Sequence, residues 1–147
     1  MEALDYERIS TLSGLERDFQ EILDLVKRSG KRKDPTVRQK LAELATDIES
    51  ARLLALRVAS ILNRDKVPNY EASMLKMFVT ETEQKLVQTA MQVFGLYGQL
   101  QEDSKWAPFN GKFEWRYRDS LEALVTRGTS EIMRNIVAQR GLGLPRS

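Results

Sequence analysis

The residues that could carry chemistry in this chain are carboxylates, hydroxyls, lysines, arginines and tyrosines, because its 147 residues include no His and no Cys. Zinc sites built from His and Cys, and nucleophilic pairs that need Cys or Ser–His, are therefore excluded within this chain. Any reaction that it serves must use the remaining groups or a bound cofactor.

The C-terminal stretch 127–138 has the most informative spacing of such residues. Gly128 breaks a helical run, and Thr129 and Ser130 stand where the next helix begins. This helix is expected to bury one apolar face, made of Ile132, Met133, Ile136 and Val137. Hydroxyls at a helix start usually accept hydrogen bonds from free backbone N–H groups, which favours a plain corner between two helices. The alternative is an anion or cofactor site, because the same N–H groups attract negative charge.

The basic stretch 27–33 is a second candidate. Lys27, Arg28 and Lys31–Lys33 place five cations in seven positions, which a phosphate-binding patch for nucleic acid or acidic lipid would need. No aromatic residues interleave to stack on bases, which favours a solvated connection between helices. The whole chain has 23 basic and 21 acidic residues, a net charge of +2. We therefore expect no nucleic-acid partner and no anionic membrane partner.

Apolar residues recur every three or four positions along most of the chain, which predicts helices. The expected helices cover residues 4–28, 35–62, 69–94, 113–126 and 130–140. Asp34 followed by Pro35 is a strong start signal for the second of them. Its alanines at 51 and 55 would let a neighbouring helix approach closely, and the wide apolar face of the third predicts contact on more than one side. We expect one all-α domain over residues 1–147, an up-and-down bundle of four to five helices.

The segment between the third and fourth helices begins with a Gly95–Gly98 turn and continues as an irregular loop. Four aromatic residues in or beside this loop would be costly to leave in water together: Trp106, Phe109, Phe113 and Trp115. They are expected either to pack the loop onto the bundle or to cover a partner surface. In the fourth helix, the spacing predicts that Tyr117, Leu121 and Leu124 point inward.

The composition is that of an ordinary globular protein, with 41% hydrophobic and 30% charged residues. No apolar run approaches the roughly 20 residues that cross a bilayer. The acidic start lacks a signal-peptide pattern, so we expect a reducing interior, either the bacterial cytoplasm or the mitochondrial matrix.

Six short motifs occur in order along the chain. They are Leu41-Ala42-Glu43-Leu44, Glu49-Ser50-Ala51-Arg52, Ala72-Ser73-Met74-Leu75-Lys76, Ala90-Met91-Gln92-Val93-Phe94-Gly95, Arg118-Asp119 and Gly128-Thr129-Ser130-Glu131-Ile132-Met133-Arg134. In this order and spacing they resemble the C-terminal domain of the acyl-CoA dehydrogenases. The resemblance implies an FAD-dependent enzyme that oxidises the Cα–Cβ bond of an acyl-CoA to a trans-2-enoyl-CoA. It also implies electron-transferring flavoprotein as the acceptor of the flavin's electrons, and a homo-oligomer, dimer or tetramer.

The family's full enzyme also has an N-terminal helical domain and a middle β-domain, which this sequence lacks. These residues by themselves are therefore expected to be inactive, because catalysis needs reacting atoms placed to within about an ångström. The alternative is a stand-alone helical bundle that keeps the fold for oligomerisation or scaffolding without chemistry.

The family's catalytic base is a Glu found in one of two places. The commoner place, directly before Gly-Thr-Ser, is Arg127 here, and an arginine cannot take a proton. The place used by the isovaleryl- and long-chain-type members lies on the first helix, directly before an Arg, and matches Glu7. Asp5 and Arg8 match positions at the family's acyl-CoA site. Without the resemblance, Glu7 would be interpreted as a solvated acid in a first helical turn.

The resemblance assigns FAD contacts to two more groups of residues. Thr129 and Glu131 match the residues that face FAD. Gln92, Gly95 and Gly98 match a Gln-x-x-Gly-Gly-x-Gly turn that meets the FAD of a neighbouring subunit. Leu96 replaces the second Gly of that turn, and the family's Arg-x-x-Phe-Gly element before the second helix is absent.

Overall fold

The computed structural model describes the backbone of residues 2–146 and the side chains of residues 12–146. The α-helices of this part are α1 (Glu2–Arg28), α2 (Pro35–Leu62), α3 (Glu71–Phe94), α4 (Lys112–Val125) and α5 (Ser130–Ile136). Short 3-10 turns lie between them, at η1 (Lys31–Lys33), η2 (Gly95–Gln99) and η3 (Pro108–Gly111), and the π-helical turn η4 (Val137–Gly141) follows α5. No strand occurs within residues 2–146.

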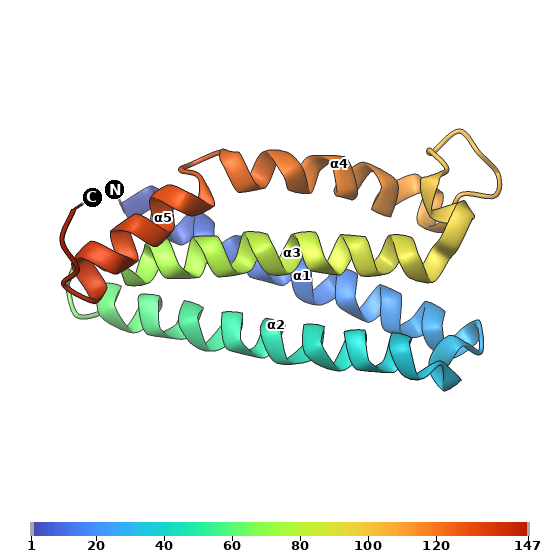
Figure 1. Cartoon of the computed structure of the whole chain (residues 1–147), viewed down its shortest axis with the longest axis horizontal. Coiled ribbons are helices and arrows are strands. Elements are labelled where there is room, and N and C mark those ends of the chain that lie inside the picture. Colours follow the sequence, from blue (N-terminus) through green and yellow to red (C-terminus); the bar gives the residue numbers. More distant parts are fainter. Residues whose placement is uncertain (1, 147) are drawn as a thin grey trace.

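Helices α1 to α4 run alternately up and down beside one another, and α5 crosses the end of the bundle where α3 begins (Figure 1). The predicted all-α, up-and-down bundle is therefore confirmed. None of the helices in the described part of the chain is long and apolar enough to cross a membrane.

Helix α3 is the centre of the bundle, because α1, α2, α4 and α5 all pack against it. Its buried residues surround most of the helix, as its wide apolar face predicts. Ala51 and Ala55 of α2 are almost fully buried, and α2 and α3 are in extensive contact. The small alanine side chains allow this close approach.

The start of α2 is capped as predicted. The Asp34 carboxylate accepts hydrogen bonds from the backbone N–H groups of Thr36, at 2.8 Å, and Val37, at 3.4 Å, and Pro35 takes the first helical position. A cap of this kind contributes about 1 kcal/mol. Before it, Lys31 donates a hydrogen bond to the Val93 carbonyl at the end of α3. The basic connection therefore ties the α1–α2 turn to the central helix.

The loop between α3 and α4 is held by three phenylalanines. The rings of Phe94, Phe109 and Phe113 lie with centroids 5.3 to 6.0 Å apart, a normal spacing for stacked or tilted aromatic pairs. Trp106 and Trp115 instead remain 66% and 53% exposed. The aromatic residues therefore divide, with the phenylalanines packing the loop and the tryptophans lying on the surface.

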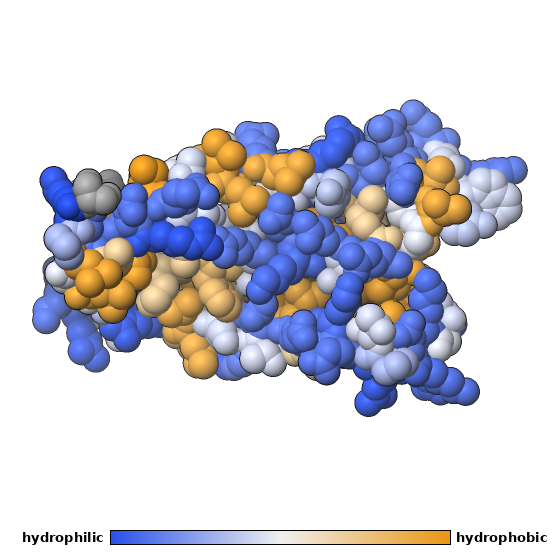
Figure 2. Space-filling model, viewed as in Figure 1, coloured by the Kyte–Doolittle hydropathy of each residue, from blue (hydrophilic) through white to orange (hydrophobic). Residues whose placement is uncertain are grey.

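Several apolar side chains remain on the surface of the bundle. Leu121 of α4 is 46% exposed, so the prediction that it points inward is wrong. Ile132 of α5 is also exposed, and only Met133 of the predicted apolar face is buried. Apolar surface is visible over α4 and near the α5 end of the bundle, within a largely hydrophilic surface (Figure 2).

Several helix boundaries differ from the predictions, among them α1, which begins at Glu2, and α4, which begins and ends one residue early. Helix α3 begins at Glu71, two residues late, and the Glu71 carboxylate accepts the Asn69 N–H in the preceding turn. Helix α5 changes to a π-helical turn after Ile136, closed by a hydrogen bond from Leu142 N–H to the Val137 carbonyl. The prediction of a regular helix to residue 140 is therefore wrong in its last turn.

Candidate functional site

The corner between α4 and α5 contains two consecutive residues with left-handed backbone. Arg127 has a φ of 59° and Gly128 a φ of 98°. A side chain at Gly128 would collide with the end of the Met133 side chain, and its φ disfavours any residue with a Cβ. The Thr129 hydroxyl then accepts the Ile132 N–H at 3.3 Å and caps α5. The interpretation of this break as a capped corner is therefore confirmed.

Lys76 of α3 holds this corner in place through hydrogen bonds from inside the bundle. The side chain is buried, with only 5% of the residue exposed. Its ammonium group donates hydrogen bonds to the Ala123 carbonyl, at 3.1 Å, and to the Gly128 carbonyl, at 2.7 Å. Ala123 lies in the last turn of α4, where carbonyls have no partner within the helix. The buried Lys76 ammonium group therefore supplies hydrogen bonds both to a carbonyl at the end of α4 and to a carbonyl of the corner.

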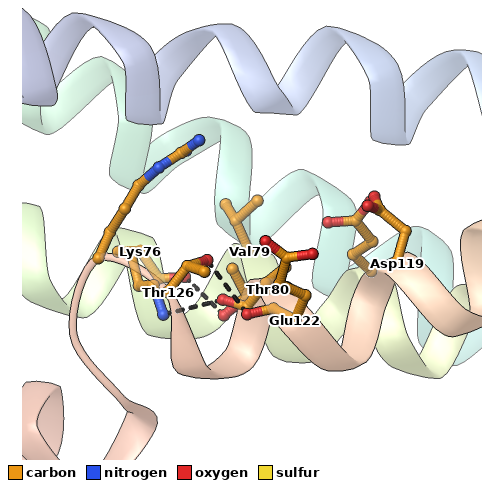
Figure 3. Close-up of a pocket in the computed structure, with 9 residues that line it drawn as sticks. Lys76, Val79, Thr80, Asp119, Glu122 and Thr126 are labelled. Atoms are coloured by element: carbon orange, nitrogen blue, oxygen red, sulfur yellow. Dashed lines mark hydrogen bonds between the residues drawn. The ribbon is translucent and has the colours of Figure 1, made fainter.

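A polar cavity of about 160 Å³ lies between α3 and α4 beside this lysine. Asp119 and Glu122 line it from α4, and Lys76 and Thr80 line it from α3 (Figure 3). Glu83 and Arg127 complete the charged lining. The cavity has room for a small polar molecule or several waters, which need polar partners of this kind.

A buried ionic network links this cavity to α1. Both oxygens of the fully buried Asp18 carboxylate are paired, one with Lys112 at 2.7 Å and the other with Arg116 at 2.9 Å. Arg116 also pairs with Glu83 at 2.5 Å, and Lys112 with Glu21 at 2.7 Å. Removing one member of a buried network leaves an uncompensated charge, so these residues fix how α1, α3 and α4 sit together.

The proton affinity of Glu83 is unusual. Burial raises the pKa of this carboxyl group, and the neighbouring Asp119 and Asp18 charges raise it further, while Arg116 acts in the opposite direction. Glu83 therefore holds its proton more tightly than an exposed glutamate does.

The residues assigned to the neighbouring subunit's FAD lie at the other end of α3. The Gln92 side chain is exposed, and its amide oxygen accepts a hydrogen bond from Lys40. Gly95 ends α3 with open space beside it. Gly98 is buried against the Met91 carbonyl and Phe94, each 3.1 Å from where a Cβ would lie. Leu96, which replaces the family's second Gly, is 83% exposed.

The other predicted contacts with FAD lie at the corner. Thr129 is partly buried, and Glu131 is exposed in the first turn of α5. Hydrogen bonds from the Glu131 backbone N–H and from the Thr129 hydroxyl lower the pKa of the Glu131 carboxyl group. Lys76, which holds the corner, is 16 positions before Gln92 on α3, about 24 Å along a helix axis. The structure therefore does not bring the two groups together.

Asp5, Glu7 and Arg8 fall on the backbone of α1, but their side chains lie outside the described residues. No group of three or more acidic residues in the described part is placed to hold a metal ion.

The polar residues inside the bundle were missed when the sequence was interpreted. Asp18 follows Leu15 by three positions and precedes Ile22 by four, so it lies within the apolar stripe of α1. Glu83 and Lys76 likewise occupy positions on α3 among residues that are buried. A charged residue within an apolar stripe is the signal that could have identified them, since such residues are rarely buried without a partner.

The chain is similar to known proteins over nearly its whole length. The family described as acyl-CoA dehydrogenase, C-terminal domain, matches residues 1–142. The chain is 32% identical to acyl-CoA dehydrogenase IpdE1 of Mycolicibacterium smegmatis, over 99% of this chain and 36% of that protein. It is 36% identical to the bovine mitochondrial short-chain specific acyl-CoA dehydrogenase, over 67% of this chain and 22% of that protein.

A solved structure of the Tcur3481-Tcur3483 steroid ACAD superposes with a TM-score of 0.89 at 27% identity, covering 98% of this chain and 38% of that chain. This chain thus spans little more than a third of the length of the first relatives that it matches. The match over nearly every residue, in sequence and in fold, shows that the chain belongs to the acyl-CoA dehydrogenase family and corresponds to its C-terminal helical domain.

Proposed function

We propose that this chain is the C-terminal helical part of an FAD-dependent acyl-CoA dehydrogenase that forms trans-2-enoyl-CoA from an acyl-CoA. The observation that carries the proposal is the family match over residues 1–142, together with the intact Gly128–Thr129 corner. The activity would belong to a protein in which the parts that bind the flavin ring and the thioester accompany this domain. Its place in the cell would be the bacterial cytoplasm or the mitochondrial matrix.

Glu7 is the proposed base, in the arrangement of the isovaleryl- and long-chain-type members. The support is that Arg127 occupies the other place for a base, and a guanidinium remains charged and cannot accept a proton. Glu7 would remove the α proton of the thioester, with Asp5 and Arg8 at the acyl-CoA site. This role requires a carboxylate close to the α carbon with a pKa raised toward neutrality by partial desolvation.

FAD, when bound, supplies the acceptor for the hydride that leaves the β carbon. Thr129 and Glu131 suit a polar edge of the flavin better than a phosphate, because the Glu131 carboxylate places a negative charge in the first turn of α5. Gln92, Gly95 and Gly98 would meet the cofactor of a neighbouring subunit, and the open space at Gly95 permits close approach of a ligand to the backbone. Leu96 would lie beside that contact.

The proposed partners are electron-transferring flavoprotein and further copies of the chain. One relative, 31% identical over 67% of this chain, is the caffeyl-CoA reductase-Etf complex subunit CarC of Acetobacterium woodii, which supports the first partner. Exposed apolar side chains on α2 and α4 support oligomer formation, namely Leu53, Leu56, Leu121 and Val125.

The test of the base uses the protein that carries this chain, purified with its flavin. Glu7→Gln should lower acyl-CoA turnover by about 100-fold or more, since loss of a general base costs on this order, while the visible flavin absorbance is retained. Glu16→Gln, an exposed acid on the same helix, is the matched control and should keep turnover unchanged. Normal turnover in Glu7→Gln would refute the assignment of the base.

A second candidate is a non-catalytic helical domain that serves assembly. Arg127 in the commoner base position favours it, and so does the likeness to the ChsE4-ChsE5 complex of Mycobacterium tuberculosis, with a TM-score of 0.81 at 25% identity. In such an assembly, another chain could supply the base. A purified protein that is colourless and lacks turnover with any acyl-CoA, yet forms a stable oligomer, would favour this candidate.

A further inference from the structure

We infer that Lys76 is a positioning residue, which holds the Arg127–Gly128–Thr129 corner in the shape that the proposed flavin contact requires. The lysine itself need not touch a ligand. Its ammonium group spans two segments, the last turn of α4 at the Ala123 carbonyl and the corner at the Gly128 carbonyl. The inference deepens the proposed function, and its catalytic part rests on it.

The corner needs these stabilising hydrogen bonds because its backbone is strained. Arg127 is a residue with a side chain in the left-handed region, at a φ of 59°, and Gly128 follows it at 98°. Conformations of this kind persist only where the surroundings enforce them. The hydrogen bonds from Lys76 are charge-assisted and buried, which makes them stronger than bonds between neutral groups.

The lysine is anchored on the most constrained element of the fold. Helix α3 packs against all the other α-helices of the described chain, so the ammonium group is presented from a fixed position. The corner, by contrast, includes the exposed Arg127, and α5 extends for only seven residues beyond it. Lys76 therefore fixes the position of the corner, and with it Thr129 and Glu131, relative to α3.

The cavity beside Lys76 explains why the cation is tolerated inside the bundle. Glu83, Asp119 and Glu122 surround the same space of about 160 Å³, and the carbonyls at the end of α4 present the negative end of the helix dipole. A neutral side chain at position 76 would leave both carbonyls without this donor. The corner would then be free to take other conformations.

Hydrogen exchange of the protein that carries this chain tests the structural part. In Lys76→Met, amides of residues 124–133 should exchange about tenfold faster or more, while amides of residues 41–58 in α2 keep their wild-type rates. Lys76→Arg retains charged donors and should restore most of the protection. Lys85→Met is the matched control, because it removes an exposed lysine of the same helix that pairs with Asp47 of α2, and it should leave the corner unchanged.

Wild-type exchange at the corner in Lys76→Met would overturn the inference. If Lys76→Met fails to fold, Lys76→Gln takes its place. Equal acceleration of the corner and α2 in that variant would also overturn the inference, since the lysine would then stabilise the whole bundle rather than the corner.

Turnover by the flavin-loaded protein tests the catalytic part. Lys76→Met should lower kcat by about tenfold with little change in KM, and shift the visible flavin band, because a displaced corner alters the flavin's polar contacts. Wild-type kcat and spectrum despite a loosened corner would overturn this part. Absence of turnover in the wild type would instead refute the proposed function, and the exchange result at the corner would still stand.

Discussion

At the scale of single residues, Glu83 shows how burial and charge act against each other in this bundle. Burial raises the pKa of its carboxyl group even though Arg116 lies 2.5 Å away. The folded state therefore favours the protonated form relative to the unfolded chain. The stability that this preference contributes is fully present below the ordinary pKa of a glutamate and is lost as pH rises through the raised value.

Glu83→Gln removes this dependence, because glutamine resembles the protonated acid. The variant should gain stability relative to the wild type as pH rises from about 4 to 7, starting near an unfolded glutamate's pKa of about 4.3. Urea unfolding across this range measures the difference in free energy of unfolding. Because the chain has no histidine, carboxyl groups are the side chains that titrate in this pH range.

Glu71→Gln provides a contrast of opposite sign. Burial also acts to raise the pKa of Glu71, but backbone N–H donors and Arg57 outweigh it, so the pKa of this group is lowered. Its stabilising contribution is present above the unfolded pKa and is lost as pH falls. The wild type should therefore become more stable relative to Glu71→Gln as pH rises. If both variants showed the same trend relative to the wild type, one of the two assigned pKa shifts would be contradicted.

At the scale of elements, the η3 turn before α4 is the most strained connection of the described chain. Phe109, Asn110 and Gly111 all have left-handed backbone, with φ of 49°, 53° and 74°. A Cβ at Gly111 would lie 2.5 Å from the Glu102 backbone nitrogen, where nothing flexible can move aside. The turn therefore depends on the absence of a side chain at this position.

Gly111→Ala should destabilise the fold by about 2 kcal/mol or more, because the strained φ and the backbone collision add. The free energy of unfolding in urea, followed by circular dichroism, measures the effect. Gly14→Ala is the control: it lies within α1 with open space around it, so alanine should stabilise the helix by about 0.5–1 kcal/mol. A neutral Gly111→Ala would show that the loop rearranges without cost.

The helices were predictable because their signals are local. Asp34–Pro35 and Gly128–Thr129 mark helix starts through backbone hydrogen bonds made within a few residues. The π-helical turn after Ile136 was not predictable, because Gly141 packs against the Tyr70 ring, a contact distant in sequence. The exposure of Leu121 and Ile132 likewise depends on which neighbours reach α4 and α5.

The candidate site was predictable only in part, for the same reason. Thr129 is identified by its motif and its capping role, but Lys76 becomes part of the site only when α3 lies beside the corner. The pairing of Asp18 with Lys112 and Arg116 also requires α1 and α4 to be adjacent. The apolar pattern in the sequence shows which side of a helix is buried, but it does not show which helix covers that side.

At the scale of the whole molecule, the central position of α3 makes the fold cooperative. Leu86 is fully buried on this helix, so Leu86→Ala should cost about 2–5 kcal/mol. Circular dichroism and tryptophan fluorescence should show one coincident unfolding transition, at lower urea than in the wild type, because no helix keeps its packing without α3. Leu96→Ala, at an 83% exposed position, should change stability by less than about 0.5 kcal/mol. Separate transitions for the two probes would show that part of the bundle unfolds independently.

The length of α3 has one more consequence. In the proposed function, the corner contacts one flavin and the Gly95–Gly98 turn, at the opposite end of this helix, contacts the flavin of a neighbouring subunit. One chain would then contribute to two flavins, and each flavin would need two chains. Cofactor binding and subunit association would then be thermodynamically linked. Free FAD would strengthen the oligomer, dilution would release the flavin, and the affinity for FAD would depend on protein concentration.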